Sequence, residues 1–79
     1  KKNTDNLIEI YKGNMSKDRI AKMANILLTI RKERGIMVED IAIRTGIDYA
    51  QVSQLLGRLE SDGIISRDLL QRCFINFQK

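Results

Sequence analysis

The fold is decided by residues 38–68, which have the sequence VEDIAIRTGIDYAQVSQLLGRLESDGIISRD. Residues 39–45 have the pattern of a short helix, because acidic side chains occupy the first turn and Ile41 and Ala42 can face inward together. Gly46 follows directly and predicts a tight turn. The stretch therefore begins with a short helix that ends in a sharp corner.

A longer amphipathic helix is expected over residues 48–62. Asp48 is a good N-cap, and Gln51, three residues later, completes a pair that resembles a capping box. Gly63 marks the end of the helix. Apolar side chains recur at i, i+3, i+4 and i+7 and form one stripe of Val52, Leu55, Leu56 and Leu59. A short helix, a tight turn and a longer helix make a helix-turn-helix arrangement, whose second helix is presented to the DNA major groove.

A further helix is predicted over residues 16–34, with Ser16 as N-cap, Asp18 in the first turn and Gly35 after the end. Its apolar positions spread over an arc of about 220° at 100° per residue, roughly twice what one packed face requires. The rest of the arc needs cover, so a homodimer through helix 16–34 is predicted. The positions left for the partner are Ile26 and Ile30 on one flank, and Ala21 and Leu28 on the other.

Four other segments are less determined. Residues 4–12 allow a short helix, with Leu7, Ile8 and Tyr11 on one face, or a short strand. Residues 36–38 favour a brief strand, and residues 64–65 begin another. Residues 73–77 fit a returning strand, but the spacing of Leu69, Leu70, Cys73, Phe74 and Phe77 also fits a fourth helix. We expect an N-terminal extension over residues 1–15 and one folded domain over residues 16–79.

The composition narrows the function. The chain has 79 residues, one cysteine and no histidine, which excludes an internal disulfide and a zinc site of the usual Cys/His type. Cys73 is therefore expected to be a small buried hydrophobe. Net charge is +4, but residues 1–35 hold nine basic and four acidic side chains, whereas residues 36–79 hold five and six. Charge thus supports a nucleic-acid partner only weakly.

The sequence contains no pattern that indicates an active site, a cofactor site or a membrane-spanning helix. No nucleophile–base pair, phosphate-binding glycine loop or metal-spaced carboxylate cluster is present, so we expect no enzymatic activity, no cofactor and no metal. No apolar run approaches the roughly 20 residues that span a bilayer, and no membrane partner is expected. A cytoplasmic location is predicted, with association with the nucleoid in a prokaryote.

The stretch from residue 38 to residue 68 resembles the winged helix-turn-helix superfamily of the MarR, ArsR and DprA C-terminal kind. The signals that match are Ile41-Ala42, Thr45-Gly46-Ile47, Val52-Ser53, Leu55-Leu56, Leu59-Glu60 and Asp62-Gly63-Ile64-Ile65. The resemblance implies a mainly α fold with a small β-hairpin, that is, a three-helix core plus a two-stranded wing. Residues 66–72 depart from it, because they lack the glycine that usually turns a wing, and a fourth helix stays an alternative there.

The candidate DNA contacts lie opposite the apolar stripe of helix 48–62 and around it. The predicted set is Arg44, Ala50, Gln51, Ser53, Gln54, Gly57, Arg58, Arg67 and Arg72. Gln and Arg suit base edges, whereas Arg44, Arg67 and Arg72 are assigned to phosphates or, in the plainer interpretation, to ordinary surface charge. Gly57 indicates either close approach to DNA or a partner, or packing inside the domain. Tyr49 is expected to pack at the edge of the stripe, with its hydroxyl in water.

These observations give two hypotheses. The first is double-stranded DNA binding in transcription regulation or in a replication or mobile-element protein. The second is a winged-helix module that docks another protein, since one fold supports both functions. Single-strand or RNA binding is weaker, because the four aromatic residues form no stacking platform.

Overall fold

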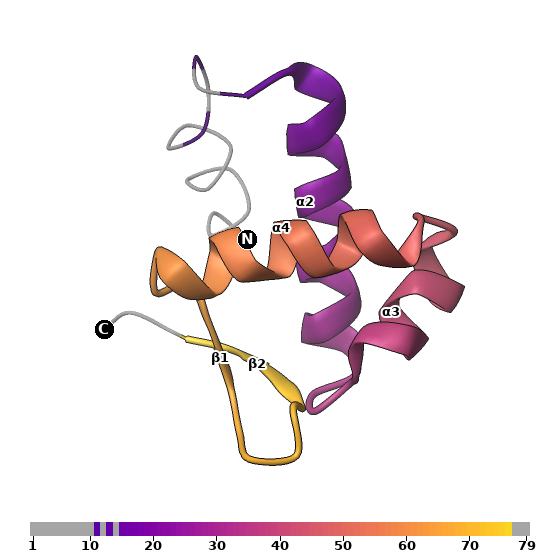
Figure 1. Ribbon diagram of the computed structural model, residues 1–79, viewed down its shortest axis with the longest axis vertical. Helices are drawn as coiled ribbons and strands as arrows, with labels where there is room; N and C mark the ends of the chain where they lie inside the picture. Colours follow the sequence, from indigo (N-terminus) through magenta and orange to yellow (C-terminus); the bar gives the residue numbers. More distant parts are fainter. Residues whose placement is uncertain (1–10, 12, 14, 77–79) are drawn as a thin grey trace.

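The computed structural model describes residues 11, 13 and 15–76, which form three helices and a β-hairpin (Figure 1). Helix α2 spans Lys17–Lys32, α3 spans Val38–Thr45 and α4 spans Tyr49–Ser61. Strands β1, Ile65–Arg67, and β2, Cys73–Ile75, follow. Helix α4 crosses in front of α2, and the β-hairpin lies below α4 in this view. The predicted mainly α fold with a three-helix core and a two-stranded wing is confirmed.

The helix ends follow the local signals in the sequence. The Ser16 hydroxyl accepts a hydrogen bond from the backbone N–H of Arg19, as an N-cap does. Gly46 ends α3 in the left-handed conformation, with φ at 73°. Asp48 caps α4 by accepting from the backbone N–H of Ala50. The capping-box role predicted for Gln51 is wrong, because its side-chain oxygen instead accepts from Lys22 Nζ of α2 at 3.0 Å.

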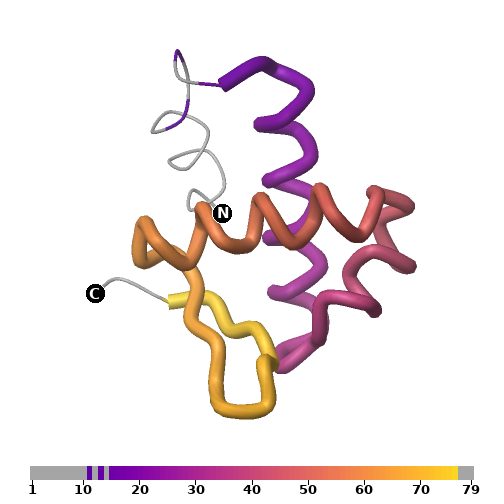
Figure 2. The backbone as a smooth tube through the Cα atoms, viewed as in Figure 1, coloured from indigo at the N-terminus to yellow at the C-terminus, as the bar shows by residue number. Residues whose placement is uncertain are grey.

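The tail is a wing, and the fourth-helix alternative is wrong. Strands β1 and β2 pair antiparallel, with Arg67 opposite Cys73. Figure 2 shows the chain leaving the end of α4, turning, and returning to the segment before α3. Ile36 pairs there with Cys73 as an isolated bridge, so the strand predicted at residues 36–38 is reduced to one residue. Phe77 lies outside the described residues.

An aspartate takes the place of a glycine at the turn of the wing. Asp68 Oδ1 accepts hydrogen bonds from the backbone N–H groups of Leu70 and Arg72, at 3.0 and 2.9 Å. Its backbone carbonyl accepts from Gln71 N, and Gln71 adopts a φ of 67°. Asx-type bonds of this kind stabilise turns without glycine. The wing therefore forms although residues 66–72 contain no glycine.

The core draws side chains from every element. It comprises Tyr11, Met23, Ile26, Leu27, Ile30, Ile36, Val38, Ile41, Val52, Leu55, Leu56, Leu59, Ile65 and Cys73. Cys73 is a free, fully buried thiol, as predicted. Ile26 and Ile30 are fully buried within the chain, so the expectation that this flank of α2 awaits a partner is wrong.

The other flank of α2 is open, since Leu28 is 44% exposed and Ala21 is exposed.

Tyr11 is only 2% exposed and packs in the same core as the helices, although it precedes residue 16. Residues 4–10, where a short helix or strand was expected, lie outside the described residues. Within the described ranges, no helix is long and apolar enough to cross a membrane.

Candidate nucleic-acid interface

Helix α4 has one buried side and one open side. Its four stripe residues, Val52, Leu55, Leu56 and Leu59, are fully buried and fix the helix in the core. Ala50, Gln54, Gly57 and Ser61 are exposed on the opposite side. The buried stripe thus holds a row of small and polar residues in solvent, and we call this row the α4 face.

Gly57 has no packing role among the described residues. Apart from the neighbouring backbone of its own helix and its two chain neighbours, no described atom lies within 4 Å of the position that a Cβ would occupy there, and the residue is exposed. Gly57 is also absent from the glycines with positive φ, so its backbone does not require glycine. Of the two interpretations from sequence, packing inside the domain is wrong, and close approach to a partner stays a prediction.

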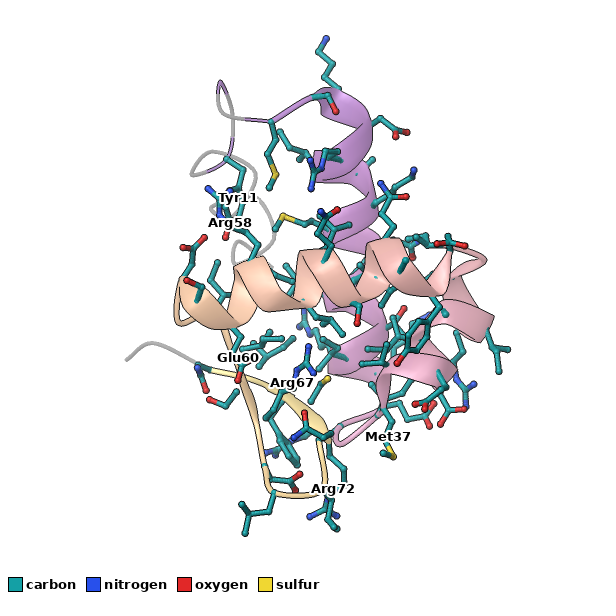
Figure 3. The ribbon with its side chains drawn as sticks, in the orientation of Figure 1. Tyr11, Met37, Arg58, Glu60, Arg67 and Arg72 are labelled. Carbon is teal, nitrogen blue, oxygen red and sulfur yellow. The ribbon has the colours of Figure 1, made fainter. Side chains whose placement is uncertain are left out.

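Gln51 and Arg58 lie on the flank of α4 that is turned toward α2 and Tyr11. Gln51 is held by Lys22, and Arg58 Nε donates to Asp62 Oδ2 at 3.1 Å. The Arg58 guanidinium also lies 5.3 Å from the centre of the Tyr11 ring (Figure 3). Gln51 and Arg58, both predicted to contact DNA, are therefore bound to other residues of this chain, and they lie beside the α4 face rather than on it.

The opposite flank of α4 is turned toward the wing. Arg67 Nε lies 3.6 Å from Glu60 Oε1, and in Figure 3 the Arg67 side chain points from β1 toward α4. Ser53, two helical turns before Glu60, is half-buried on this side. The wing and this flank of α4 thus form one continuous surface.

Tyr49 was missed by sequence reasoning. It was expected to pack beside the stripe with its hydroxyl in water, and it is 53% exposed, so more of the side chain than the hydroxyl is open to solvent. Tyr49 is the first residue of α4, directly after the cap. Its position in the first turn was the available signal, because the core covers the middle of α4 more fully than its start.

All four arginines predicted to contact DNA are paired with carboxylates of their own chain. Two pairs have i, i+4 spacing: Arg58 with Asp62 at 3.1 Å, and Arg72 with Asp68 at 2.6 Å. Arg67 pairs with Glu60, and Arg44 donates two hydrogen bonds to Glu33, at 2.8 and 3.2 Å. The charge of the surface around α4 is accordingly low.

Arg44 lies apart from the other predicted contacts. It lines a groove together with Asn25, Leu28, Thr29 and Lys32 of α2 and with Glu33, the residue that follows this helix. Arg67 and Arg72 instead belong to the wing, where Arg67 pairs with Glu60 of α4 and Arg72 lies at the far end of the hairpin, against Asp68 and Phe74 (Figure 3). The structure thus brings Arg67 to the flank of α4, but neither Arg72 nor Arg44.

The wing is fixed to the helical core. The guanidinium carbons of Arg34 and Arg72 lie 5.6 and 6.0 Å from the centre of the Phe74 ring, close enough for cation–π attraction. The backbone N–H of Gly35 donates to the Cys73 carbonyl, and Cys73 N–H donates to Ile36 O, both at 2.9 Å. These contacts hold the wing in one orientation relative to α2.

The shifted pKa values arise from structural pairs. Burial and a hydrogen bond to Asp62 raise the pKa of Tyr11. That same hydrogen bond, with help from Arg58, lowers the pKa of Asp62, and Arg72 lowers the pKa of Asp68. Burial raises the pKa of the Cys73 thiol. Each pKa shift thus arises from burial or from a contact within the fold. Among the described residues, no three His, Cys, Asp or Glu side chains lie close enough together to hold a metal ion.

Comparison with protein families gives one match. Residues 24–66 match the model of a family described as winged helix-turn-helix DNA-binding. The matched segment covers more than half of the chain and runs from the middle of α2 into β1. Neither the curated proteins nor the solved structures give a match.

Proposed function

The chain belongs to the winged helix-turn-helix DNA-binding family, and on that premise we propose that it binds double-stranded DNA with the α4 face in the major groove. One observation supports this most: the buried stripe of α4 backs an exposed row of small and polar residues. Side chains of this size let a helix approach base edges closely. The exposed Tyr49 at the start of α4 extends this surface.

Gln54 is the best candidate for a base contact. It is exposed on the α4 face, and within the described part of the chain it makes no hydrogen bond. A free amide donates and accepts at once, which matches the N6 and N7 edge of adenine. Ser53 and Gly57 lie beside it along the helix. Gln54 would therefore supply most of the base discrimination.

The wing arginines and Arg58 would contact phosphates. Each must exchange its carboxylate partner for a phosphate, and exposed ion pairs of this kind contribute only about 0–1 kcal/mol. The exchange therefore costs little for Arg72, whose side chain is 49% exposed, and for Arg58 at 47%, and costs more for Arg67, whose side chain is only 17% exposed. These contacts would fix the register of the domain on the duplex rather than its sequence preference.

We assign the chain to transcription regulation or to a replication or mobile-element protein, without enzymatic activity of its own and acting inside the cell. A homodimer through α2 would place two copies of α4 on two half-sites. Leu28 and Ala21 are the apolar residues open on α2 for such a contact. Sedimentation equilibrium at tens of micromolar tests the dimer, and a single 9.1 kDa species would exclude it.

Gln54→Ala tests the assignment of the α4 face. Against a duplex selected from a random library, we expect a loss of about 1–3 kcal/mol in specific binding with an unchanged melting temperature. Arg58→Ala should lose less, because Arg58 is already engaged by Asp62 and Tyr11. Asn25→Ala, an exposed change on α2, is the matched control. If Gln54→Ala binds as tightly as the parent, the α4 face is not the reading surface.

A protein-docking module is the second candidate, and the pairing of the four arginines favours it. A surface with few free cations attracts phosphates weakly. The two functions differ in salt dependence, because DNA binding releases counterions and weakens steeply as salt rises. Anisotropy titrations with a mixed-sequence duplex at about 50 and about 200 mM salt, a range over which DNA affinity falls steeply, distinguish DNA binding from protein docking. Absence of duplex binding at the lower salt would favour docking of a protein.

A further inference from the structure

The tip of the wing carries two leucines in solvent. Leu69 is 99% exposed and Leu70 is 63% exposed. Apolar side chains are costly to leave in water, and here two adjacent ones lie in the turn between β1 and β2. They are flanked along the chain by Arg67 and Arg72. The two leucine side chains have no role in the packing of the described part of the domain, whereas Arg67 pairs with Glu60 of α4 and Arg72 with Asp68.

The backbone that presents these leucines is fixed. Asp68 binds the backbone N–H groups of Leu70 and Arg72, and its Oδ2 accepts from Arg72 Nε at 2.6 Å. Below the tip, the Phe74 contacts and the Ile36–Cys73 bridge tie the wing to α2. A preformed tip loses little conformational entropy when it inserts into a partner.

The tip is too small for a stable protein interface. Two leucine side chains offer roughly 60–120 Å² each, taken from their transfer free energy at 25 cal/mol per Å². A standard protein–protein interface buries about 800 Å² on each partner. Insertion between base steps needs only one or two apolar side chains, with basic residues beside them to contact the backbone. Arg72 is the basic side chain at this end of the wing, 49% exposed and paired with Asp68, so the size of the tip is what favours DNA over protein.

We propose that Leu69 and Leu70 form an apolar wedge that enters the minor groove, partly unstacks one base step and bends the duplex. The inference rests on the proposed function, in which α4 occupies the major groove. Because β1 begins four residues after α4 ends and packs against it, the hairpin is attached rigidly to the end of α4, and its turn projects away from that helix (Figure 1). A projection beside a helix in the major groove meets the adjacent phosphate ridge and minor groove.

The test measures bending and unstacking separately from affinity. A selected duplex of about 30 base pairs, a length on which a protein-induced bend is measurable, carries dyes at both ends and 2-aminopurine at the step next to the wing. The parent should shorten the distance between the dyes, as a bend of 20–90° does, and raise the 2-aminopurine fluorescence. Leu69→Ser with Leu70→Ser should lose both signals but keep duplex binding within about tenfold. Ile43→Ser, at a residue 74% exposed on α3, is the matched apolar control and should behave as the parent.

The outcomes are distinct. A parent that binds the duplex without bending or unstacking it overturns the wedge and leaves DNA binding by α4 intact. A parent for which no duplex can be selected removes the proposed function and the wedge with it. A double variant that bends DNA as the parent does, yet no longer self-associates in sedimentation, overturns the wedge in favour of contact between two copies.

Discussion

Replacing Gly57 by alanine separates the demands of folding from those of DNA binding. Gly57 lies inside α4 with an ordinary helical φ and open space where a Cβ would stand. Glycine in a helix interior is about 0.8–1.0 kcal/mol less favourable than alanine. Nothing in the described fold explains why the helix accepts this cost. The structure therefore predicts that Gly57→Ala stabilises the domain.

The magnitude follows from helix propensity alone, because the new methyl group meets no described neighbour. A gain of about 0.5–1 kcal/mol is expected. For a domain of 60–100 residues, 1 kcal/mol shifts the melting temperature by about 4–8 °C, so the rise should be roughly 2–8 °C. On DNA the same methyl group would stand between the α4 backbone and the bases. Crowding of this kind costs about 1–3 kcal/mol, which is roughly a 5- to 150-fold loss of affinity.

Thermal unfolding followed by circular dichroism, with anisotropy titrations on the selected duplex, measures both effects in one preparation. Gly63→Ala is the matched control, since Gly63 has a φ of +77° and a left-handed conformation costs an L-residue about 1–2 kcal/mol. The control should melt at a lower temperature. A Gly57→Ala variant that is less stable than the parent would refute the open environment of Gly57. A stabilised variant with undiminished DNA affinity would remove Gly57 from the interface.

Four further predictions concern the core and its ion pairs. Leu56→Ala should cost about 2–5 kcal/mol, because Leu56 is fully buried, and an unchanged melting temperature would contradict the register of α4. Tyr11→Phe removes the hydrogen bond to Asp62 and should cost about 0.5–1.5 kcal/mol in urea unfolding, whereas equal stability would mean that Tyr11 is not docked. The pKa of Asp62 is lower in the folded state, so the stabilisation that its carboxylate gives is present above about pH 4 and is lost as pH falls through the folded pKa. Asp62→Asn should therefore make the free energy of unfolding less dependent on pH over that acid range. An unchanged pH profile would speak against the hydrogen bond between Tyr11 and Asp62. The buried Cys73 thiol, with its raised pKa, should react with thiol reagents only as fast as the wing opens, and rapid labelling of the native protein would contradict the position of β2.

The three helices were predictable because their signals are local. Ser16, Gly46 and Asp48 each set a helix end through a bond to a residue within four positions. The stripe of α4 likewise repeats along one helix, so its periodicity is enough to predict which side is buried. The open side of α4 followed from the same periodicity.

The wing was ambiguous because its turn uses a side chain in place of a glycine. The adjacent Leu69 and Leu70 have a helical spacing with Cys73, yet they lie in solvent at the tip. What decides the structure is Asp68, whose carboxylate binds three donors of the next four residues. A composition rule that looks for glycine cannot detect this turn.

The remaining errors involve partners far apart in the sequence. Gln51 was expected to bind its own helix end, but Lys22 reaches it from α2. Ile26 and Ile30 were left for a second chain, but the fold covers them completely. Likewise the arginines near α4 looked free in the sequence, although Glu33 and Glu60 are brought to two of them only by folding.

The bridge between Ile36 and Cys73 has a consequence for how the domain assembles. It joins the segment before α3 to the last described strand, so the sheet closes only after all three helices have been made. Pairing across such a separation is slow compared with helix formation, since the loop must close before the contact forms. During synthesis, α2, α3 and α4 leave the ribosome before residue 73, with Ile36 still lacking its partner strand. During synthesis, the wing is therefore expected to be the last part of the domain to acquire its structure.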